Sequence, residues 1–456
     1  MSDQPAVRPT PVSGFPEWLP HVRLVELRWL DTIRTAFERY GFCSIETPSA
    51  ERMDVLLSKG DTSKEVYTLG RVHDVDDDPT QADPTQSDST RDDSRLGLRF
   101  DLTVPLARYT AQHFNDLVFP FKRYQIQRVW RGERPQDGRF REFTQCDIDV
   151  INPDRVPIHF DAELPRIVHE VLTSLDLPAW TINVNNRKVL QGFYEGLGIS
   201  RPLDVIRAVD KIDKIGPDGV ARLLADRLDP SRLQAVLRLA RLRGGPAEVR
   251  ELGVRSPLLD EGLEELDFVL SELSDLPNVV ADFSIARGLD YYTGTVYEGK
   301  FVDWPEYGAI CSGGRYDDLA GSFIRRELPG VGMSIGFSRI FAKMLSEGLL
   351  DPGPSSPADV LVVLPKDRRP IATSTAKALR DRGFNVELYH QEDKVAKQLR
   401  YAARKGIPFV WFPPFDEGRP HEVKDLASGT QTTTDPATWS PGGQRPANRS
   451  GTGANG

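Results

Sequence analysis

The sequence has few cysteines and no long apolar run, and each shortage argues against a class of protein. Its 456 residues include only three cysteines, Cys43, Cys146 and Cys311, and no two are close in sequence. A disulfide framework and a cysteine-ligated zinc site are therefore not expected. No apolar run approaches the roughly 18 residues that span a bilayer, and the first residues, MSDQPAVRPTPVSG, lack the basic and apolar parts of a secretory signal. We expect a cytoplasmic protein that does not enter a membrane.

The sequence also lacks the P-loop pattern G-x-x-x-x-G-K-[ST], which argues against a P-loop nucleotide site. A nucleophile-elbow pattern, G-x-S-x-G, occurs at residues 332–336 with Ser334 at its centre. A serine hydrolase of that type needs a parallel sheet followed by an Asp and a His, whereas His390 and His421 fall in what we expect to be a separate domain. We therefore interpret Ser334 as an ordinary strand residue.

Most of the formal net charge of −9 lies in one segment. Residues 74–95, DVDDDPTQADPTQSDSTRDDSR, contain eight Asp against two Arg, so the remainder of the chain carries only −3. Because this segment has almost no apolar side chain to bury, we predict a disordered acidic loop. We expect residues 1–15 and 440–456 to be disordered as well.

Hydrophobic periodicity predicts an α+β fold for residues 16–350. The expected elements are a helix over 24–40, a short strand after Gly41, a strand and helix over 96–112, a hairpin over 118–150, strands within 282–301 and 307–315, and a strand and helix over 332–345. Strands joined by turns imply an antiparallel sheet. Residues from about 201 to 276 show helical spacing and little strand signal, so we predict a helical insertion there.

A cluster of Pro, Ser and Gly, DPGPSSP at residues 351–357, marks the boundary of a second domain. Strand and helix patterns alternate after it, with strands at 360–364, 385–389 and 408–412 and helices at 371–382 and 392–404. Such alternation predicts a small α/β domain with a largely parallel sheet over residues 358–439.

The second strand of the hairpin alternates between two kinds of side chain. Phe143, Gln145, Asp147 and Asp149 share one face, while the intervening residues are mainly apolar. The preceding strand places Gln127, Val129 and Arg131 on a common face as well. An aromatic ring, amides, carboxylates and a guanidinium could converge there on a zwitterion and a phosphate, although a half-exposed structural strand alternates in the same way.

Several segments together resemble the histidyl-tRNA synthetases, a family of class II aminoacyl-tRNA synthetases. RVWRGERPQDGRFREFTQCDIDV, from Arg128, resembles the family's motif 2, and CSGGRYDDL followed by GVGMSIGFSRI resembles motif 3 and the strands before it. LRFDLTVPLARY, from Leu98, and ARGLDYYTGTVYE, from Ala286, stand in the family's order. Weaker matches are motif 1, FERYGFCSIETPSAE, and KQLRYAARKGIPFVWF. The resemblance covers about residues 16–439 and implies a class II catalytic domain followed by an anticodon-binding domain.

The resemblance implies an ATP-dependent histidine–tRNA ligase. L-histidine and ATP would form histidyl-adenylate and pyrophosphate with the help of Mg²⁺, and histidine would then pass to the 3′ end of tRNA(His). Both reactants are anionic, so fixed positive charge is needed. Arg131 would hold the α-phosphate, Arg287 would neutralise charge between carboxylate and phosphate, and Arg339 would hold the terminal phosphates. Motif 1 would form a homodimer.

The other site residues are carried over in the same way. Phe143 would stack on adenine, and Arg139 would contact ATP or the acceptor end of the RNA near Gln136. The residues implied to bind histidine are Asp101, Thr103 and Gln145 at the ammonium group, Asp149 and Tyr292 at the imidazole, Tyr291 in the pocket wall, and Arg131 and Arg287 beside the carboxylate. Lys397 and Arg400, on a basic helix of the last domain, would contact tRNA.

Two features depart from the family pattern. Ser338 stands where motif 3 usually has an acidic residue before its arginine, so we expect an altered affinity for ATP without loss of function. The acidic loop replaces a short connection. A catalytically silent paralogue, such as a regulatory subunit of histidine biosynthesis, would keep the fold without the chemistry. The presence of the site arginines and of the C-terminal domain favours the enzyme.

Overall fold

The computed structural model describes residues 8–58, 65–70, 95–286, 288, 291–317, 320–321 and 323–441. Within these ranges no helix combines the length and apolar character that a bilayer crossing requires. Arg287, nearly all of the acidic segment 74–95 and most of the predicted disordered ends lie outside the described residues. The chain divides into two compact units, residues 1–16 with 32–347, and residues 17–31 with 348–456.

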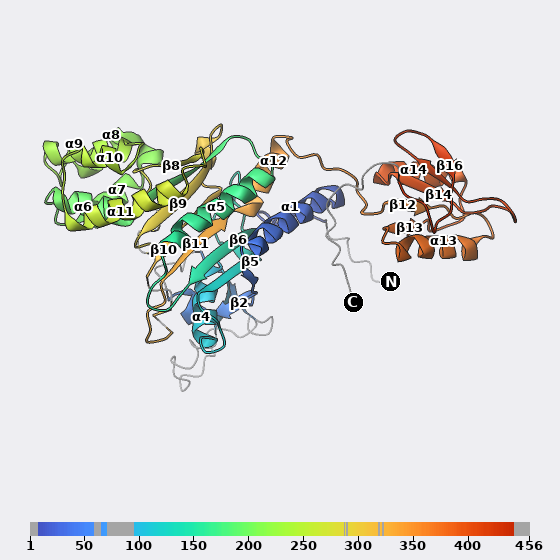
Figure 1. Cartoon of the computed structure of the whole chain (residues 1–456), viewed down its shortest axis with the longest axis horizontal. Helices are drawn as coiled ribbons and strands as arrows, with labels where there is room; N and C mark the ends of the chain where they lie inside the picture. The colour runs from blue at the N-terminus through green and yellow to red at the C-terminus, as the bar shows by residue number, and fades with distance from the viewer. Residues whose placement is uncertain are drawn as a thin grey trace. The chain divides into compact units, whose positions relative to one another are not determined.

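The larger unit is built on an eight-stranded sheet (Figure 1). In spatial order its strands are β1 (Cys43–Ser44), β5 (Phe121–Trp130), β6 (Glu142–Ile151), β11 (Gly330–Ile335), β10 (Cys311–Tyr316), β9 (Thr295–Phe301), β7 (Trp180–Asn186) and β8 (Val279–Ala281). All neighbours pair antiparallel except β1 with β5 and β7 with β8, which are parallel. The sequence therefore predicts the antiparallel centre correctly and misses the two parallel edge pairs.

A three-stranded antiparallel sheet and several helices complete this unit. The small sheet has the order β2 (Ala50–Arg52), β4 (Leu96–Leu98) and β3 (Thr68–Leu69). Outside the insertion, this unit contains α2 (Met53–Leu56), α4 (Thr103–Gln112), α5 (His159–Ser174), α12 (Phe337–Ser346) and the part of α1 (Pro20–Arg39) from residue 32 onward. Helix α5 packs on β11 and α12 packs on β6, so the central strands are covered by helices (Figure 1). Apolar side chains of β6 face this packing, and Cys146, Ile148 and Val150 are fully buried.

The predicted helical insertion follows β7 (Figure 1). Its helices are α6 (Arg187–Gly196), α7 (Pro202–Val209), α8 (Ile212–Leu224), α9 (Pro230–Arg241), α10 (Pro246–Arg250) and α11 (Pro257–Glu272). Side-chain caps begin three of them, because Asn186, Asp229 and Ser256 accept hydrogen bonds from backbone amides of the first turn.

The C-terminal unit has a five-stranded sheet of its own. Its elements are β12 (Val360–Val362), α13 (Arg369–Asp381), β13 (Val386–Leu388), α14 (Val395–Lys405), β14 (Phe409–Phe412), β15 (Glu422–Asp425) and β16 (Gln431–Thr433). The order is β13-β12-β14-β15-β16, with parallel pairs among the first three strands and antiparallel pairs among the last three. Trp411 and Leu361 lie in a continuous buried core. The predicted parallel strands are present, while the antiparallel pair β15 and β16 was not predicted.

Candidate active site

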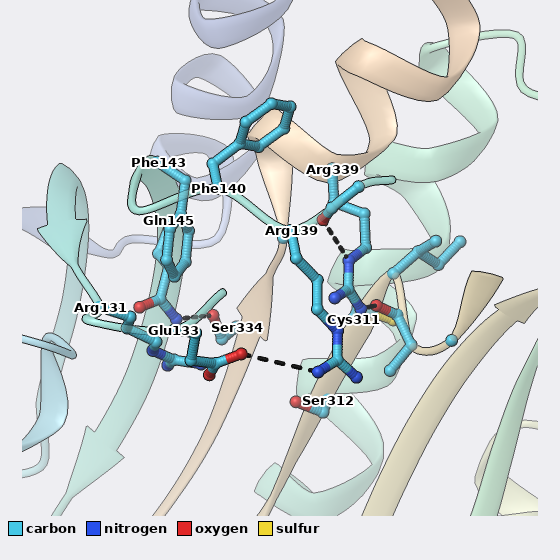
Figure 2. Close-up of a pocket in the computed structure, with 15 residues that line it drawn as sticks. Arg131, Glu133, Arg139, Phe140, Phe143, Gln145, Cys311, Ser312, Ser334 and Arg339 are labelled. Carbon is cyan, nitrogen blue, oxygen red and sulfur yellow. Dashed lines mark hydrogen bonds and ion pairs between the residues drawn. The ribbon is translucent and has the colours of Figure 1, made fainter. Parts of the chain in front are cut away.

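A cavity of about 270 Å³ opens beside the centre of the large sheet. It is lined by side chains of β6, β10, β11 and α12 and by the loop that joins β5 to β6 (Figure 2). Five residues predicted from the sequence meet there, namely Arg131, Arg139, Phe143, Gln145 and Arg339. Three guanidinium groups beside an aromatic ring and an amide suit a ligand that carries phosphates and an aromatic base.

Arg131 follows the end of β5 and is held in place by two contacts. Its Nε donates to the carbonyl oxygen of Phe100 at 3.0 Å, and its guanidinium lies 5.1 Å from the ring centroid of Phe143. Both contacts fix the direction of the group before any ligand arrives. Arg139, in the loop, lies 3.5 Å from the carboxylate of Glu133 (Figure 2). Gln136 pairs with Arg139 through two backbone hydrogen bonds, which turn the loop back toward the cavity.

Arg339, near the start of α12, is oriented by backbone carbonyls. Its Nε donates to Gly138 at 2.9 Å, and its Nη1 donates to Ala309 at 2.7 Å. The hydroxyl of Ser338 instead accepts a hydrogen bond from the backbone amide of Thr144 at 2.8 Å. In this chain, two loops therefore position the motif 3 arginine.

Tyr307, next in sequence to the cavity-lining Gly308, supports the same arginine. Its hydroxyl donates to the carbonyl oxygen of Arg339 at 2.8 Å, and its ring centroid lies 5.9 Å from the guanidinium. It also lies against the loop, because a Cβ added to Gly138 would stand 2.3 Å from its hydroxyl oxygen. Gly138 has a φ of 66°, a conformation that side chains rarely adopt.

Replacing Tyr307 with leucine should raise the KM for ATP about tenfold and leave the KM for histidine unchanged. The change removes one hydrogen bond and one cation–π contact, each worth about 0.7 kcal/mol, and a loss of about 1.4 kcal/mol is a factor of ten. Tyr307→Phe keeps the ring and should give an increase of roughly threefold. Steady-state ATP–pyrophosphate exchange measures both constants. Equal increases in the two KM values would show a general loosening of the cavity instead.

Deeper along the same face of β6 lies a buried group of charged side chains. Asp149 forms an ion pair with Arg123 of β5 at 2.6 Å and accepts a hydrogen bond from the hydroxyl of Tyr316 at 2.8 Å. Neither Arg123 nor Asp149 is more than 5% exposed. Burial raises the pKa of Asp149 to about 7, and the nearby guanidinium of Arg123 opposes that rise.

Asp101 belongs to the same electrostatic environment. It precedes α4, and its carboxylate accepts a hydrogen bond from the amide of Val104 at 3.1 Å. Burial raises its pKa to about 6, while Arg131 opposes the rise and Asp147 adds to it. Among the described residues, the three carboxylates of Asp101, Asp147 and Asp149 lie near two guanidinium groups, the buried one of Arg123 and that of Arg131. This excess of negative charge favours a cationic ligand.

Two tyrosines predicted for the amino-acid pocket pack against this group. The rings of Tyr291 and Tyr292 lie 5.1 Å apart, and Tyr291 lies 5.3 Å from the ring of Tyr316. Thr103 is the first residue of α4, two positions after Asp101. Arg287 lies outside the described residues, so its predicted role stays a prediction.

Some expected contacts differ in the structure. Gln127 was predicted to face the ligand, but its side-chain oxygen accepts hydrogen bonds from Thr47 and Arg99. The sequence analysis also missed Arg123, Tyr307 and Tyr316. The signal for Arg123 was available, because it lies on the same face of its strand as Gln127.

The predicted RNA contacts of the last domain lie on α14. Lys397 is 56% exposed and pairs with Asp393 at 2.8 Å, while the Nε of Arg400 donates to the carbonyl oxygen of Ala396 at 3.3 Å. Exposed pairs of this kind contribute about 0 to 1 kcal/mol, so a phosphate can readily replace the aspartate.

The antiparallel sheet, with arginines from the loop between β5 and β6 and from the start of α12, defines the catalytic domain of a class II aminoacyl-tRNA synthetase. A family model described as histidyl-tRNA synthetase matches residues 14–340, and one described as an anticodon binding domain matches residues 359–435. The chain belongs to the histidyl-tRNA synthetase family. The family and the fold class predicted from the sequence are therefore confirmed.

Curated relatives and solved structures support the same family assignment. The histidine–tRNA ligase of Thermobifida fusca is 66% identical, over 96% of this chain and 100% of its own length. The histidine–tRNA ligase of Micrococcus luteus is 46% identical, over 95% of this chain and 96% of its own length. The crystal structure of histidyl-tRNA synthetase from Nostoc sp. superposes with a TM-score of 0.82 at 35% identity and covers 94% of this chain and 97% of that one. A Bacillus halodurans structure described as an ATP phosphoribosyltransferase regulatory subunit/histidyl-tRNA synthetase gives 0.70 at 21% identity, with 87% and 97% covered, and shows the shared fold alone.

Proposed function

We propose that the chain is a histidine–tRNA ligase that converts L-histidine and ATP to histidyl-adenylate and pyrophosphate and then transfers histidine to the 3′ end of tRNA(His). The observation that carries this proposal is the arrangement along one face of β6. Three arginines suited to phosphates line the cavity, and buried carboxylates lie deeper along the same strand. The names of the curated relatives agree with this activity.

In the first reaction, a carboxylate oxygen of histidine attacks the α-phosphorus of ATP, and the bond from that phosphorus to the bridging oxygen of pyrophosphate breaks. We assign Arg131 to the α-phosphate, Arg339 to the outer phosphates and Arg287 to the charge that develops between the reactants. Phe143 would stack on adenine, and Arg139 with Gln136 would meet ATP or the acceptor end of the RNA. These arginines keep their charge throughout, so the clamp requires no proton transfer.

Histidine would lie against the carboxylates. We assign Asp101, Thr103 and Gln145 to its ammonium group, Asp149 and Tyr292 to its imidazole, and Tyr291 to the pocket wall. A buried polar site of this kind rejects apolar side chains strongly, by about 10⁴ to 10⁵ where hydrogen bonds are lost. Selection of histidine would then need no editing domain.

Mg²⁺ fits this cavity as an ion held mainly by the substrate. Glu133 is the carboxylate among the described lining residues, and Mg²⁺ commonly takes one or two carboxylates together with phosphates and water. Glu133 would hold the ion, which would neutralise charge on the outer phosphates. We also propose a cytoplasmic homodimer formed through the region around residues 37–51, which should give twice the chain mass of 51.1 kDa in light scattering.

ATP–pyrophosphate exchange with each amino acid in turn tests the activity. We expect exchange with histidine alone, followed by charging of tRNA(His). A catalytically silent paralogue would show no exchange with any amino acid, and exchange with a different amino acid would overturn the assignment of the pocket.

The affinity for histidine should fall severalfold as the pH is lowered from about 8 to about 6. Burial raises the pKa of Asp101 to about 6 and that of Asp149 to about 7, so both carboxylates are ionised at the higher pH and partly protonated at the lower one. Free histidine also gains a proton on its imidazole near pH 6.5, so affinities are compared for the form with a neutral imidazole. The α-amino group of that form is charged over most of this range and binds an ionised carboxylate better than a protonated one. Calorimetry in buffers of different ionisation heat should also detect protons released on binding below about pH 7. Tighter binding at the lower pH would contradict this charge assignment.

A further inference from the structure

Ser334, the serine of the G-x-S-x-G pattern, has no role in the function proposed above, yet it lines the cavity. It lies on β11 directly opposite Asp147 of β6 in the strand register. Its hydroxyl oxygen accepts a hydrogen bond from the side-chain nitrogen of Gln145 at 2.8 Å (Figure 2). Ser334 therefore sits between two polar side chains of the neighbouring strand.

Ser334 and Asp147 stand directly opposite each other on antiparallel strands, so their side chains lie close together on one face of the sheet. Burial raises the pKa of Asp147, and the hydroxyl of Ser334 opposes that rise, as a proton directed at the carboxylate does. A hydroxyl in that orientation can accept a hydrogen bond from Gln145 but cannot donate one to it. The amide of Gln145 must then turn its nitrogen toward Ser334 and its oxygen, Oε1, away. The hydrogen bond from Gln145 to Ser334 therefore fixes which end of the amide is presented to a ligand.

Two acceptor atoms on this face lack a hydrogen-bond partner among the described residues, Oε1 of Gln145 and Oδ1 of Asp147. Both atoms are buried, and Asp147 is only 3% exposed. The two residues are two positions apart on β6, a rise of about 7 Å, so a small group with several N–H donors can lie between their side chains. Leaving buried acceptors unpaired is unfavourable, so the pair is suited to a ligand that donates and carries positive charge.

We propose that Ser334 and Asp147 select the α-ammonium group of the substrate, Ser334 as a positioning residue that orients Gln145 and Asp147 as a second, charged acceptor. This inference rests on the proposed function, because it names residues that recognise the same amino acid. Ser334 and Asp147 thereby join Asp101, Thr103 and Gln145 at the ammonium subsite.

Two unreactive analogues of histidine measure the contribution of the ammonium group to binding apart from that of the rest of the substrate. Histidinol keeps the ammonium and the imidazole and lacks the carboxylate, whereas imidazolepropionate keeps the carboxylate and the imidazole and lacks the ammonium. The affinity for each analogue is measured by competition against histidine in pyrophosphate exchange. Ser334→Ala should lower the affinity for histidinol about tenfold, as expected for one hydrogen bond to a charged group. Asp147→Asn has nearly the same shape and should weaken it by about tenfold to a hundredfold. The affinity for imidazolepropionate should change less than about twofold in both variants, and the KM for ATP should stay constant.

Ser338→Ala is the matched control. Ser338 is also a buried serine bound to β6, through the amide of Thr144, and it does not contact Gln145 in the described structure. Its loss should change the affinity for both ligands by the same factor. Unchanged affinity of the full chain variants for imidazolepropionate also shows that the pocket is folded.

The outcomes separate this inference from the function. If the parent enzyme shows no exchange with histidine, the proposed function fails. If the parent is active and both Ser334→Ala and Asp147→Asn weaken the two ligands equally, or weaken neither, the ammonium assignment of Ser334 and Asp147 is wrong. Should Ser334→Ala fail to fold, Asp147→Asn decides the matter alone.

Discussion

Replacing Arg131 with alanine should slow formation of histidyl-adenylate by about 10² to 10³ while the protein stays folded. The guanidinium is fixed by the carbonyl of Phe100 and the ring of Phe143, so it meets the phosphate without reorganising. A charge arranged in advance stabilises the transition state more than the bound substrates, and its loss therefore lowers kcat more than it raises the KM for ATP. Pyrophosphate exchange and single-turnover formation of the adenylate measure the effect.

Arg128→Ala is a control of the same chemistry three residues earlier, near the end of β5. Arg128 is 60% exposed and pairs with Glu142 at 2.8 Å, away from the residues that line the cavity. Its loss should change the exchange rate less than about twofold, because exposed ion pairs contribute little. Arg287→Ala should behave like Arg131→Ala. An Arg131→Ala enzyme that exchanges pyrophosphate at the parent rate would overturn the assignment of the phosphate site.

Removing the chain after Pro357 should leave formation of histidyl-adenylate largely intact and reduce charging of tRNA by about tenfold or more. The residues that line the cavity all precede that position, and the C-terminal unit has a separate core. If this unit holds the anticodon end of the RNA, its loss removes affinity for tRNA while the reaction between histidine and ATP continues. Parallel assays of exchange and aminoacylation separate the two effects.

Substitutions in the full chain test the same assignment without removing a domain. Lys397→Ala with Arg400→Ala should raise the KM for tRNA, and the dependence of binding on salt should become less steep as phosphate contacts disappear. Lys377→Ala is a matched control, since Lys377 is likewise an exposed lysine paired with an aspartate four residues away. An equal loss of exchange and charging on truncation would mean that the C-terminal unit supports the catalytic fold, and its assignment to RNA binding would be withdrawn.

The alternation along β6 predicts the composition of the site well, because side chains of a pleated strand alternate between faces. It does not predict their partners. The pairing of Asp149 with Arg123 follows from the register of β5 against β6, and the contact with Tyr316 requires β10, far along the chain. Long-range register of this kind cannot be derived from local pattern.

The strands predicted within residues 282–301 show a different limit. Among the described residues of that range, only β9 forms a strand, and Tyr291 and Tyr292 instead lie in a turn, where both amides donate to the carbonyl of Gly288. Aromatic and β-branched residues have high strand propensity, which favours the wrong local structure here. Their ring contacts with each other and with Tyr316 override that propensity.

The backbone support of Arg339 bears on how this site can vary. An acidic side chain that orients an arginine is lost by a single base change, whereas the carbonyls of Gly138 and Ala309 remain whatever side chains those positions carry. What must be preserved is the path of two loops, and Gly138 has the positive φ that constrains one of them. Residue 338 therefore does not need a negative charge to orient Arg339, and a neutral serine there is compatible with an intact phosphate site.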